Sequence, residues 1–272
     1  MCGIVWICVE VIFVLADERQ KIIYEKIKKS GAVTTTNLVE KFGVSVETIR
    51  RDLLFMEKQG MLKRVHGGAV EIQGMAKEFE LKQRNKEYVE EKIELSKNAA
   101  FFVNENDIIF VDAGSTAIHF CESLKENFSN LTVVTYSSDV FNLLCYHKNF
   151  KLILCAGHFN KTENAFYGSL VMDAIDGINV QKAFIFPTAV SIEHGICGYN
   201  EEFCHLQKMV IKSADMVYVL ADSGKFEKKA LLKIADMKKE YQYITDSDLS
   251  SELEKIYAEN DINIFKGGAK EK

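Results

Sequence analysis

The sequence contains little proline, and its cysteines lack the spacing of a disulfide or metal framework. One proline in 272 residues argues against Pro-rich linkers and favours regular helices and strands. No two of the seven cysteines are spaced as CxxC, and most lie in apolar runs such as LILCAG. We therefore expect reduced, buried thiols in a cytosolic protein, with metal or redox chemistry as the alternative. The 47% hydrophobic and 27% charged residues are typical of a globular protein and exclude a disordered or fibrous chain.

The N-terminal segment lacks the features of a signal peptide and of a membrane-spanning helix. Residues 1–16, MCGIVWICVEVIFVLA, have no basic start, Glu10 interrupts them, and a spanning helix needs roughly 20 residues. We expect this extension to lie upstream of the true start, with Val14 as an alternative initiation codon. The competing interpretation is a membrane-associating stub. An intact mass that includes Met1 would contradict the first interpretation.

Charge is unevenly distributed along the chain. Residues 17–70 contain eleven Lys and Arg against seven Asp and Glu, a net charge of +4. This leaves 23 basic and 32 acidic residues elsewhere, a net charge of −9. A basic N-terminal module joined to an acidic body is expected when only one domain contacts a polyanion.

Three helices and a hairpin are predicted for residues 17–70. Apolar residues recur at helical spacing in ERQKIIYEKIKKSG, TTTNLVEKFG and VSVETIRRDLLFMEK, and these helices stop at Gly31, Gly43 and Gly60. Ser45 is a suitable N-cap for the third helix, with Thr48 three positions on. LKRVHGGAVEI alternates around a Gly-Gly turn, which is typical of a two-stranded wing. The pattern predicts a winged helix-turn-helix domain.

A winged helix-turn-helix domain reads DNA with the N-terminal part of its third helix, which enters the major groove. Arginine at this place can bond guanine bidentately, and the wing and its glycine N–H groups would hold phosphates. The alternative for any single charge is a solvated helix face, and we favour that alternative for Arg50 taken alone. The predicted DNA-binding residues are Thr34, Thr35, Ser45, Glu47, Thr48, Arg50, Arg51, Lys63, Arg64, His66, Gly67 and Gly68.

The same residues resemble a known family. ERQKII, VSVETIRRDL and LKRVHGGA closely resemble the N-terminal domain of DeoR-type bacterial transcriptional regulators, over residues 17–70. The resemblance implies double-stranded operator DNA as a partner. It also supports the alternative start, because such proteins commonly begin a couple of residues before the ERQ.

Beyond a polar helical linker at residues 71–86, the body of the chain at residues 87–272 alternates strands with helices. Apolar runs such as DIIFVDAG, LTVVTYS, FKLILCAG, KAFIFPTAVS and MVYVLADSGKF mostly precede helical patterns. Near-continuous apolar strands followed by helices indicate an α/β fold with a doubly wound, mostly parallel sheet covered on both faces. Ligands of such sheets bind beyond the carboxyl ends of the strands.

Polar groups suited to a phosphate follow several of these strands. Asp112-Ala113-Gly114-Ser115-Thr116 opens a helix with two hydroxyls and free N–H groups, although an N-cap serine alone would look identical. Hydroxyls also follow the second strand, a glycine follows the third, and Lys225 supplies an ammonium after MVYVL. The predicted effector-binding residues are Asp112, Gly114, Ser115, Thr116, Ser137, Ser138, Gly157, Asp222 and Lys225.

Most of the body resembles the C-terminal effector domain of the DeoR family, which is similar in fold to ribose-5-phosphate isomerase. In that family the DxGST-like turn, the second strand end and the DxxKF segment surround a phosphorylated sugar, so the resemblance implies such an effector here. One departure stands out: where the family is glycine-rich, this chain reads PTAVSIEHGICGYN, and Ala156 replaces the first of a usual Gly-Gly pair. The extra Cβ atoms narrow the approach of backbone to a ligand.

We interpret the chain as a DNA-binding regulator, a repressor of carbohydrate-metabolism genes, with no catalytic residue, cofactor or metal. The alternative is a sugar-phosphate isomerase carrying an accessory DNA-binding domain, but FPTAVS lacks the carboxylate expected of its base. A weaker alternative is a winged helix used for protein contacts. We expect a cytoplasmic homo-oligomer, dimer or tetramer, without membrane contact, because one short helix reads too few bases.

Overall fold

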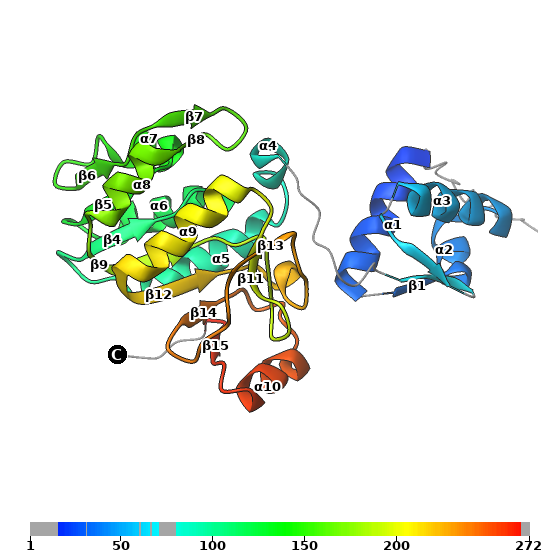
Figure 1. Cartoon of the computed structure of the whole chain (residues 1–272). Coiled ribbons are helices and arrows are strands. Elements are labelled where there is room, and N and C mark those ends of the chain that lie inside the picture. Colours follow the sequence, from blue (N-terminus) through cyan, green and yellow to red (C-terminus); the bar gives the residue numbers. More distant parts are fainter. Residues whose placement is uncertain (1–15, 31, 60, 66, 71–79, 268–272) are drawn as a thin grey trace, which may run out of the picture. The chain divides into compact units, whose positions relative to one another are not determined.

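The chain divides into two compact units, Met1–Gln73 and Gly74–Lys272, each with its own core. The computed structural model describes residues 16–30, 32–59, 61–65, 67–70 and 80–267. The apolar extension predicted for residues 1–16 therefore lies outside the described residues, apart from Ala16, where the first helix begins. The two units are described separately (Figure 1).

The first unit is the predicted winged helix-turn-helix. Its helices are α1 (Ala16–Ser30), α2 (Thr35–Phe42) and α3 (Val46–Lys58), and its strands are β1 (Ala32–Thr34), β2 (Lys63–Val65) and β3 (Gly68–Val70). The core is built from the apolar stripes of the three helices, including Ile27, Leu38, Ile49, Leu53 and Met56. These stripes are the positions that helical periodicity predicted.

Two local features shape this unit. Gly43 ends α2 with φ +62°, a left-handed conformation that glycine adopts without a steric penalty. The wing is three-stranded in the order β1-β3-β2, so β1 adds a strand that the sequence pattern did not predict. A Cβ on Gly68 would lie 2.0 Å from the carbonyl oxygen of Val33, so glycine is required there for β3 to pair with β1.

The second unit is built on a seven-stranded sheet in the order β15-β14-β12-β9-β4-β5-β6, and each neighbouring pair is parallel. The predicted fold class, a winged helix-turn-helix followed by a mostly parallel α/β domain, is confirmed. The strands are β4 (Ile108–Val111), β5 (Thr132–Thr135), β6 (Lys151–Leu154), β9 (Val180–Ile185), β12 (Ala214–Leu220), β14 (Gln242–Ile244) and β15 (Ile264–Phe265).

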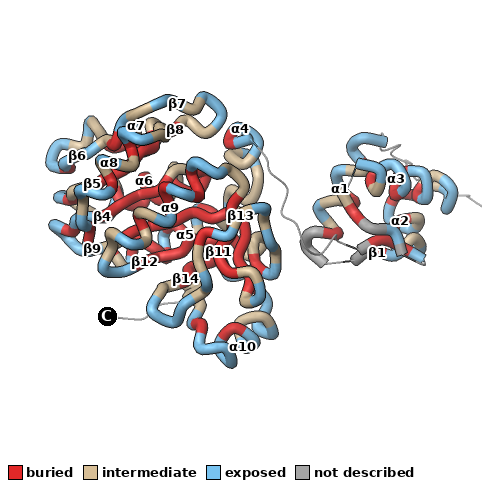
Figure 2. The backbone as a smooth tube through the Cα atoms, in the orientation of Figure 1, coloured by how far each residue is buried: buried red, intermediate tan, exposed pale blue. Residues whose placement is uncertain are grey.

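Helices cover both faces of this sheet. One face packs against α5 (Val89–Ala100), α6 (Ser115–Asn127) and α7 (Ser138–Leu144), and the other against α8 (Ser169–Asp176) and α9 (Glu201–Ser213). Buried residues concentrate in the central strands and the facing sides of these helices (Figure 2). A further helix, α10 (Ser251–Glu259), precedes the edge strand β15.

Smaller elements join the main strands. The hairpin β7 (His158–Asn160) and β8 (Ala165–Tyr167) follows β6, and a small antiparallel sheet joins β10 (Ala189–Ser191), β11 (Gly195–Gly198) and β13 (Leu232–Ala235). A short 3-10 turn, η1 (Ser223–Lys225), follows β12. The sequence pattern did not predict these short antiparallel pieces.

The structure differs from the predicted linker at its C-terminal end. Residues 80–86, which were assigned to a linker over 71–86, belong to the second unit and include the one-turn helix α4 (Leu81–Arg84). Leu81 is buried, and this contact attaches the turn to the folded body. Residues 71–79 lie outside the described residues.

The strand order places a topological switch point between β4 and β9. From β4 the chain first builds outward through β5 and β6, and then returns to add β9, β12 and β14 on the other side. Crevices at such switch points, beyond the carboxyl ends of the strands, are the usual ligand sites of open parallel sheets.

The predicted buried thiols are confirmed at four of the five described cysteines, Cys121, Cys155, Cys197 and Cys204, whereas Cys145 is partly exposed. Burial raises the pKa of Cys155 to about 11 and that of Cys204 to about 12. Thiols with such pKa values are poor nucleophiles at neutral pH.

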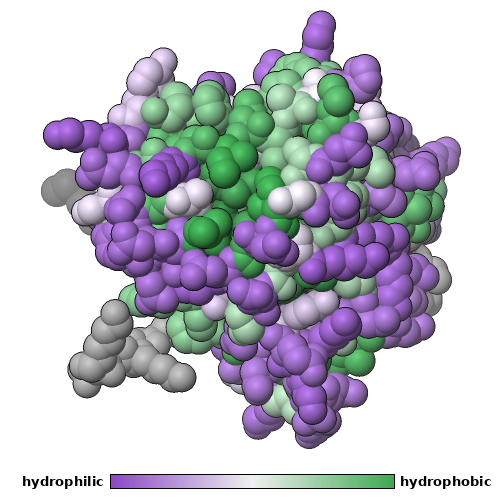
Figure 3. Space-filling view, turned by 60° about the vertical axis from the view of Figure 1, so that its left-hand side comes forward, coloured by the Kyte–Doolittle hydropathy of each residue, from purple (hydrophilic) through white to green (hydrophobic). Residues whose placement is uncertain are grey.

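One face of the second unit carries exposed apolar side chains. Ile153 on the edge strand β6, Phe159 on β7 and Leu170 on α8 are all exposed. Figure 3 shows apolar side chains gathered on the face that it presents. Among the described residues, no helix combines the length and apolar character needed to cross a membrane.

Candidate functional site

The first candidate surface is the N-terminal half of α3. Ser45 caps this helix: its Oγ accepts the Thr48 N–H at 3.2 Å and lies 2.9 Å from the Thr48 Oγ1. Ser45, Glu47, Arg50 and Arg51 are exposed, and Thr48 is half-buried. The predicted reading residues of α3 therefore lie on its solvent side, opposite the core.

Charges on α3 have different partners. Arg50 lies 3.8 Å from the Glu47 carboxylate in an exposed i,i+3 pair, which is worth little in water. Asp52 is buried instead, and accepts from Arg19 Nε at 2.6 Å and Gln20 Nε2 at 3.0 Å. This buried pair fixes α1 against α3, so it serves the fold and not the exposed face.

The other predicted DNA contacts lie on α2 and the wing. Thr34 caps α2, its Oγ1 accepting the Asn37 N–H at 3.3 Å, and Thr35 follows it. Arg64 is exposed on β2, and its backbone N–H donates to Glu57 Oε1 at 2.8 Å, which ties the wing to α3. Lys63 is also on β2, whereas His66 lies outside the described residues. Gly67 lies in the turn with φ +82°, and Gly68 is the first residue of β3.

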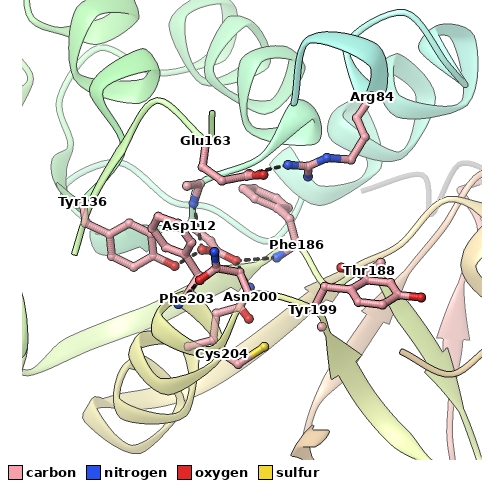
Figure 4. Close-up of a pocket in the computed structure, with 13 residues that line it drawn as sticks. Arg84, Asp112, Tyr136, Glu163, Phe186, Thr188, Tyr199, Asn200, Phe203 and Cys204 are labelled. Carbon is pink, nitrogen blue, oxygen red and sulfur yellow. Dashed lines mark hydrogen bonds and ion pairs between the residues drawn. The ribbon is translucent and has the colours of Figure 1, made fainter. Parts of the chain in front are cut away.

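The second candidate site is a pocket at the switch point between β4 and β9. Its walls come from the ends of β4, β5 and β9, from α4, α9 and the β7–β8 loop, and it holds about 560 Å³ of space including its open mouth (Figure 4). Among the predicted effector residues, Asp112 alone lines it. Arg84, Tyr136, Glu163 and Phe186 are lining residues that the sequence analysis did not select.

Asp112 is buried at the base of this pocket and is saturated with hydrogen bonds. Its Oδ1 accepts from the Ala113 N–H at 2.7 Å and from the Tyr136 hydroxyl. Its Oδ2 accepts from the Phe186 N–H at 2.9 Å and from Gln207 Nε2 at 2.7 Å (Figure 4). A carboxylate has about four acceptor positions, so all are occupied by the protein.

Two effects oppose each other at this carboxyl. Burial raises the pKa of Asp112 above its ordinary value, while the four hydrogen bonds favour the charged form and act in the opposite direction. Besides the adjacent Ala113, the donors are the residue after β5, the residue after β9 and a residue of α9, so Asp112 joins these three elements at the pocket wall. Direct contact with the effector, as predicted for Asp112 from the sequence, would require one of these bonds to be given up.

Beside the pocket, α6 opens with unused hydrogen-bonding capacity. Gly114, with φ +146°, precedes the first helical residue, and Ser115 and Thr116 are buried in the first turn. Thr116 Oγ1 is buried without a hydrogen-bond partner. The first turn of a helix also leaves N–H groups without intrahelical acceptors, and these favour an anion.

Arg84 lies beside this helix start and interacts with two further cations, Lys92 and Lys225. A Cβ on Gly114 would lie 3.9 Å from Arg84 Nη1, so the guanidinium is beside it. Lys225 Nζ lies 3.5 Å from Asp222 Oδ2, and burial together with nearby Arg84 lowers the pKa of Lys225. Burial, then the repulsion from Lys225 and Arg84, lowers the pKa of Lys92 to about 8. The Asp222 carboxylate opposes both shifts, and a bound anion would act on the two ammonium groups in the same direction as Asp222.

The remaining predicted effector residues support the fold and do not line the pocket. Ser137 caps α7, its Oγ accepting the Val140 N–H at 3.3 Å, and Ser138 Oγ donates to the Asn164 carbonyl at 2.8 Å. A Cβ on Gly157 would lie 2.6 Å from the carbonyl oxygen of Tyr167, so this glycine permits close packing. The hydroxyls of Ser137 and Ser138 thus follow β5 as predicted, but both form hydrogen bonds to neighbouring backbone groups.

The pocket residues missed by sequence analysis left few signals. Arg84 was assigned to the linker, and Glu163 sits in a loop that follows a strand. Tyr136 and Phe186 lie at the ends of the apolar strands predicted in LTVVTYS and KAFIFPTAVS, where an aromatic residue is equally typical of a core, so neither was predicted to line a pocket. Among the described residues, no cluster of three or more His, Cys, Asp or Glu side chains could hold a metal ion.

Comparisons with known proteins agree with both units. Residues 19–74 match the model of the DeoR-like helix-turn-helix domain, and residues 87–247 match that of the DeoR C terminal sensor domain. The chain is 28% identical to the HTH-type transcriptional regulator IolR of Bacillus subtilis, over 88% of this chain and 95% of that protein. It is also 28% identical to the lactose phosphotransferase system repressor of Staphylococcus epidermidis, over 86% and 93% of the two chains.

A solved structure is similar at a lower level. Ribose 5 phosphate isomerase A from Neisseria gonorrhoeae aligns with a TM-score of 0.38 and 17% identity, over 50% of this chain and 52% of that chain. This similarity is too low to carry the enzyme's activity to this chain. The two family matches together span most of the sequence, so this chain belongs to the DeoR family of helix-turn-helix transcriptional regulators.

Proposed function

We propose that the protein represses carbohydrate-metabolism genes and that a phosphorylated sugar modulates its operator binding. The first unit would read the operator through the exposed side of α3, with Arg51 bonding a base edge. The second unit would bind the effector at the pocket between β4 and β9. The similar lactose phosphotransferase system repressor supports the link to sugar metabolism.

The observation that carries the effector class is the start of α6. Thr116 Oγ1 is buried without a partner, and Arg84 lies beside Gly114 at the same helix turn. Lys92 and Lys225 are near enough to Arg84 for its positive charge to act on both. A phosphate group offers several acceptor oxygens and negative charge, which such a turn binds well. The adjoining pocket, with its carbonyl, hydroxyl and amide groups, would receive the sugar.

We also propose that the protein has no isomerase activity. Abstracting a proton next to a carbonyl needs a base with a free lone pair within reach of the substrate. The Asp112 carboxylate lines the pocket, but the four protein donors occupy its acceptor positions. Glu163, the other lining carboxylate, is paired with Arg84.

Thermal unfolding with ligand panels tests the effector class. Pentose and hexose phosphates are compared with the corresponding free sugars, and at least one phosphate should raise the midpoint where its free sugar does not. Failure of every phosphate to raise it would contradict the proposal. Incubation with the same phosphates, followed by separation of the products, should show no conversion.

DNA reading is tested by selecting bound sequences from a random duplex library with the full chain. We expect an enriched motif with repeated half-sites, because two or more copies of α3 are needed to read a long enough sequence. The phosphate that stabilises the protein should then change the affinity for that motif. A library with no enriched motif would contradict specific operator binding.

A further inference from the structure

Arg84 connects the pocket with the part of the chain that leads to the first unit. It ends α4, the first described helix after residue 73, and its side chain lines the pocket. We propose that Arg84 binds the anionic group of the effector, exchanging its ion pair with Glu163 for that group, and that this exchange displaces α4. The inference rests on the proposed function, because it requires an anionic effector.

Arg84 is placed to make this exchange. It is the single cationic side chain among the described residues that line the pocket, and Nη2 is paired with Glu163 Oε2 (Figure 4). The guanidinium also lies beside Gly114, at the start of α6. An incoming phosphate at that turn would therefore meet both the helix N–H groups and the guanidinium. A guanidinium binds phosphate bidentately. Arg84 can therefore exchange the singly charged Glu163 carboxylate for a doubly charged phosphate.

Asp112 does not compete for Arg84. Its oxygens are taken by Ala113, Tyr136, Phe186 and Gln207, so no acceptor position remains for a guanidinium. Glu163 is thus the carboxylate that holds Arg84 among the described pocket residues. The proposed exchange replaces the Arg84–Glu163 ion pair with an ion pair between Arg84 and the effector.

Glu163 is the fixed partner of this pair. The Asn160 Oδ1 accepts the N–H groups of Thr162 at 2.9 Å and Glu163 at 3.0 Å, and this turn holds the β7–β8 loop. The other end, α4, is a single turn and depends on contacts outside itself. In the proposed exchange, Arg84 and α4 with it move relative to the Glu163 loop.

The backbone of Arg84 is also attached to the cation cluster. Lys92 Nζ donates to the carbonyl of Arg84 at 2.5 Å and to that of Glu87 at 2.6 Å. A bound anion near Lys92 would draw its ammonium away from these carbonyls, which would loosen the end of α4. The same bound anion would therefore attract the Arg84 side chain and release the Arg84 carbonyl from Lys92.

Inorganic phosphate binding to the full chain tests the exchange. Titration calorimetry is performed on the wild type and on Arg84→Gln, Arg84→Lys and Glu163→Gln. We expect saturable binding to the wild type, at least fivefold weaker binding to Arg84→Gln, and an intermediate value for Arg84→Lys. Glu163→Gln should bind at least threefold more tightly, because the competing carboxylate is gone. Cooperative unfolding without phosphate verifies that each variant is folded.

The possible failures are distinct. No saturable binding to the wild type would overturn the anion site of the proposed function, and this inference with it. Equal binding by wild type and Arg84→Gln would overturn this inference alone. Weaker binding by Arg84→Gln with unchanged binding by Glu163→Gln would keep Arg84 as a ligand and overturn the exchange.

Hydrogen exchange of α4 tests the displacement. The N–H groups of Gln83 and Arg84 donate to the Glu80 carbonyl at 3.0 Å, and that of Asn85 to Leu81 at 2.8 Å. Saturating phosphate should change the exchange rates of these amides at least threefold in the wild type and leave them unchanged in Arg84→Gln. Unchanged rates in the phosphate-bound wild type would overturn the displacement of α4.

Discussion

At Asp112, four hydrogen-bond donors meet one buried carboxylate. The sequence placed this residue correctly at the end of a strand, because apolar DIIFV precedes it. Its donors could not be predicted: Tyr136, Phe186 and Gln207 lie 24, 74 and 95 positions away in the chain. Only the strand order brings them together, and periodicity carries no information about that order.

Replacing Asp112 by asparagine should destabilise the second unit. The amide NH₂ would face donors that now bond an oxygen, which leaves buried groups unpaired. We expect the free energy of unfolding in urea to fall by about 2–4 kcal/mol. Tyr136→Phe removes a single donor and is the matched control, with a loss of about 1–2 kcal/mol. Unchanged stability of Asp112→Asn would contradict the structural role.

Lys92 makes stability depend on pH. Burial lowers its pKa to about 8 in the native state, against 10.5 ordinarily, so between these values the unfolded chain binds more protons. Stability should rise with pH across this range, and this contribution is lost as the pH falls through 8. The unfolding free energy of the wild type relative to Lys92→Met should increase by up to about 3 kcal/mol between pH 7.5 and 10.

The control for this measurement lies on the same helix. Lys97 is exposed on α5, and Lys97→Met should follow the wild type at every pH. Both variants are compared in the same urea titrations, so that other titrating groups cancel in the difference. If the unfolding free energy of Lys92→Met and that of the wild type change equally with pH, Lys92 is not the source of the pH dependence.

At the scale of an element, α3 separates a structural face from an exposed one. Arg51→Ala should weaken binding to the selected operator by roughly 1–3 kcal/mol, because the bidentate base contact that we propose for Arg51 would be lost. Arg50→Ala is the control on the adjacent position: Arg50 already pairs with Glu47, and we expect an effect of less than about 0.5 kcal/mol. Gel-shift titrations measure both.

Two further readouts sharpen the comparison of these arginines. Thermal unfolding of both variants should match the wild type, because Arg50 and Arg51 are exposed and outside the core. Binding of the stabilising sugar phosphate should also be unchanged. Operator affinity that is the same for Arg51→Ala and the wild type would refute the assignment of Arg51.

Elements with strong periodicity were predicted, and short ones were not. The stripes of α1, α2 and α3 and the apolar runs of β4, β5 and β9 each carry a clear pattern. The strands β1, β7 and β8 are three residues long, too short for alternation to be recognised. Residues 71–86 were predicted as a polar helical linker, and nothing in that pattern indicated that Arg84 in α4 would line a pocket.

On the scale of the whole molecule, the net charge is positive over residues 17–70 and negative over the rest of the chain. DNA binding should therefore depend steeply on salt, since phosphate contacts release counterions. Arg64→Ala should reduce the slope of log affinity against log salt by about 1 and weaken all sequences alike. Lys151→Ala, an exposed charge on the edge strand β6, should leave the slope unchanged.

If Arg64→Ala leaves the slope of log affinity against log salt unaltered, Arg64 on the wing does not contact a DNA phosphate. A slope that Lys151→Ala reduces equally would show that charge on the second unit also contributes. The two variants carry the same change in net charge, so total charge cannot explain a difference between them.

The wholly parallel order of the seven-stranded sheet also has a consequence for the time course of folding. Strand β4 pairs with β9, which follows it by about 70 residues of chain, so the central pairing of this unit must wait for most of its chain. The winged unit contains mainly local contacts and comes first in the chain, and such units fold early. During synthesis the nascent protein should acquire its DNA-reading surface before it can sense anything, so newly made molecules should bind DNA without responding to the effector.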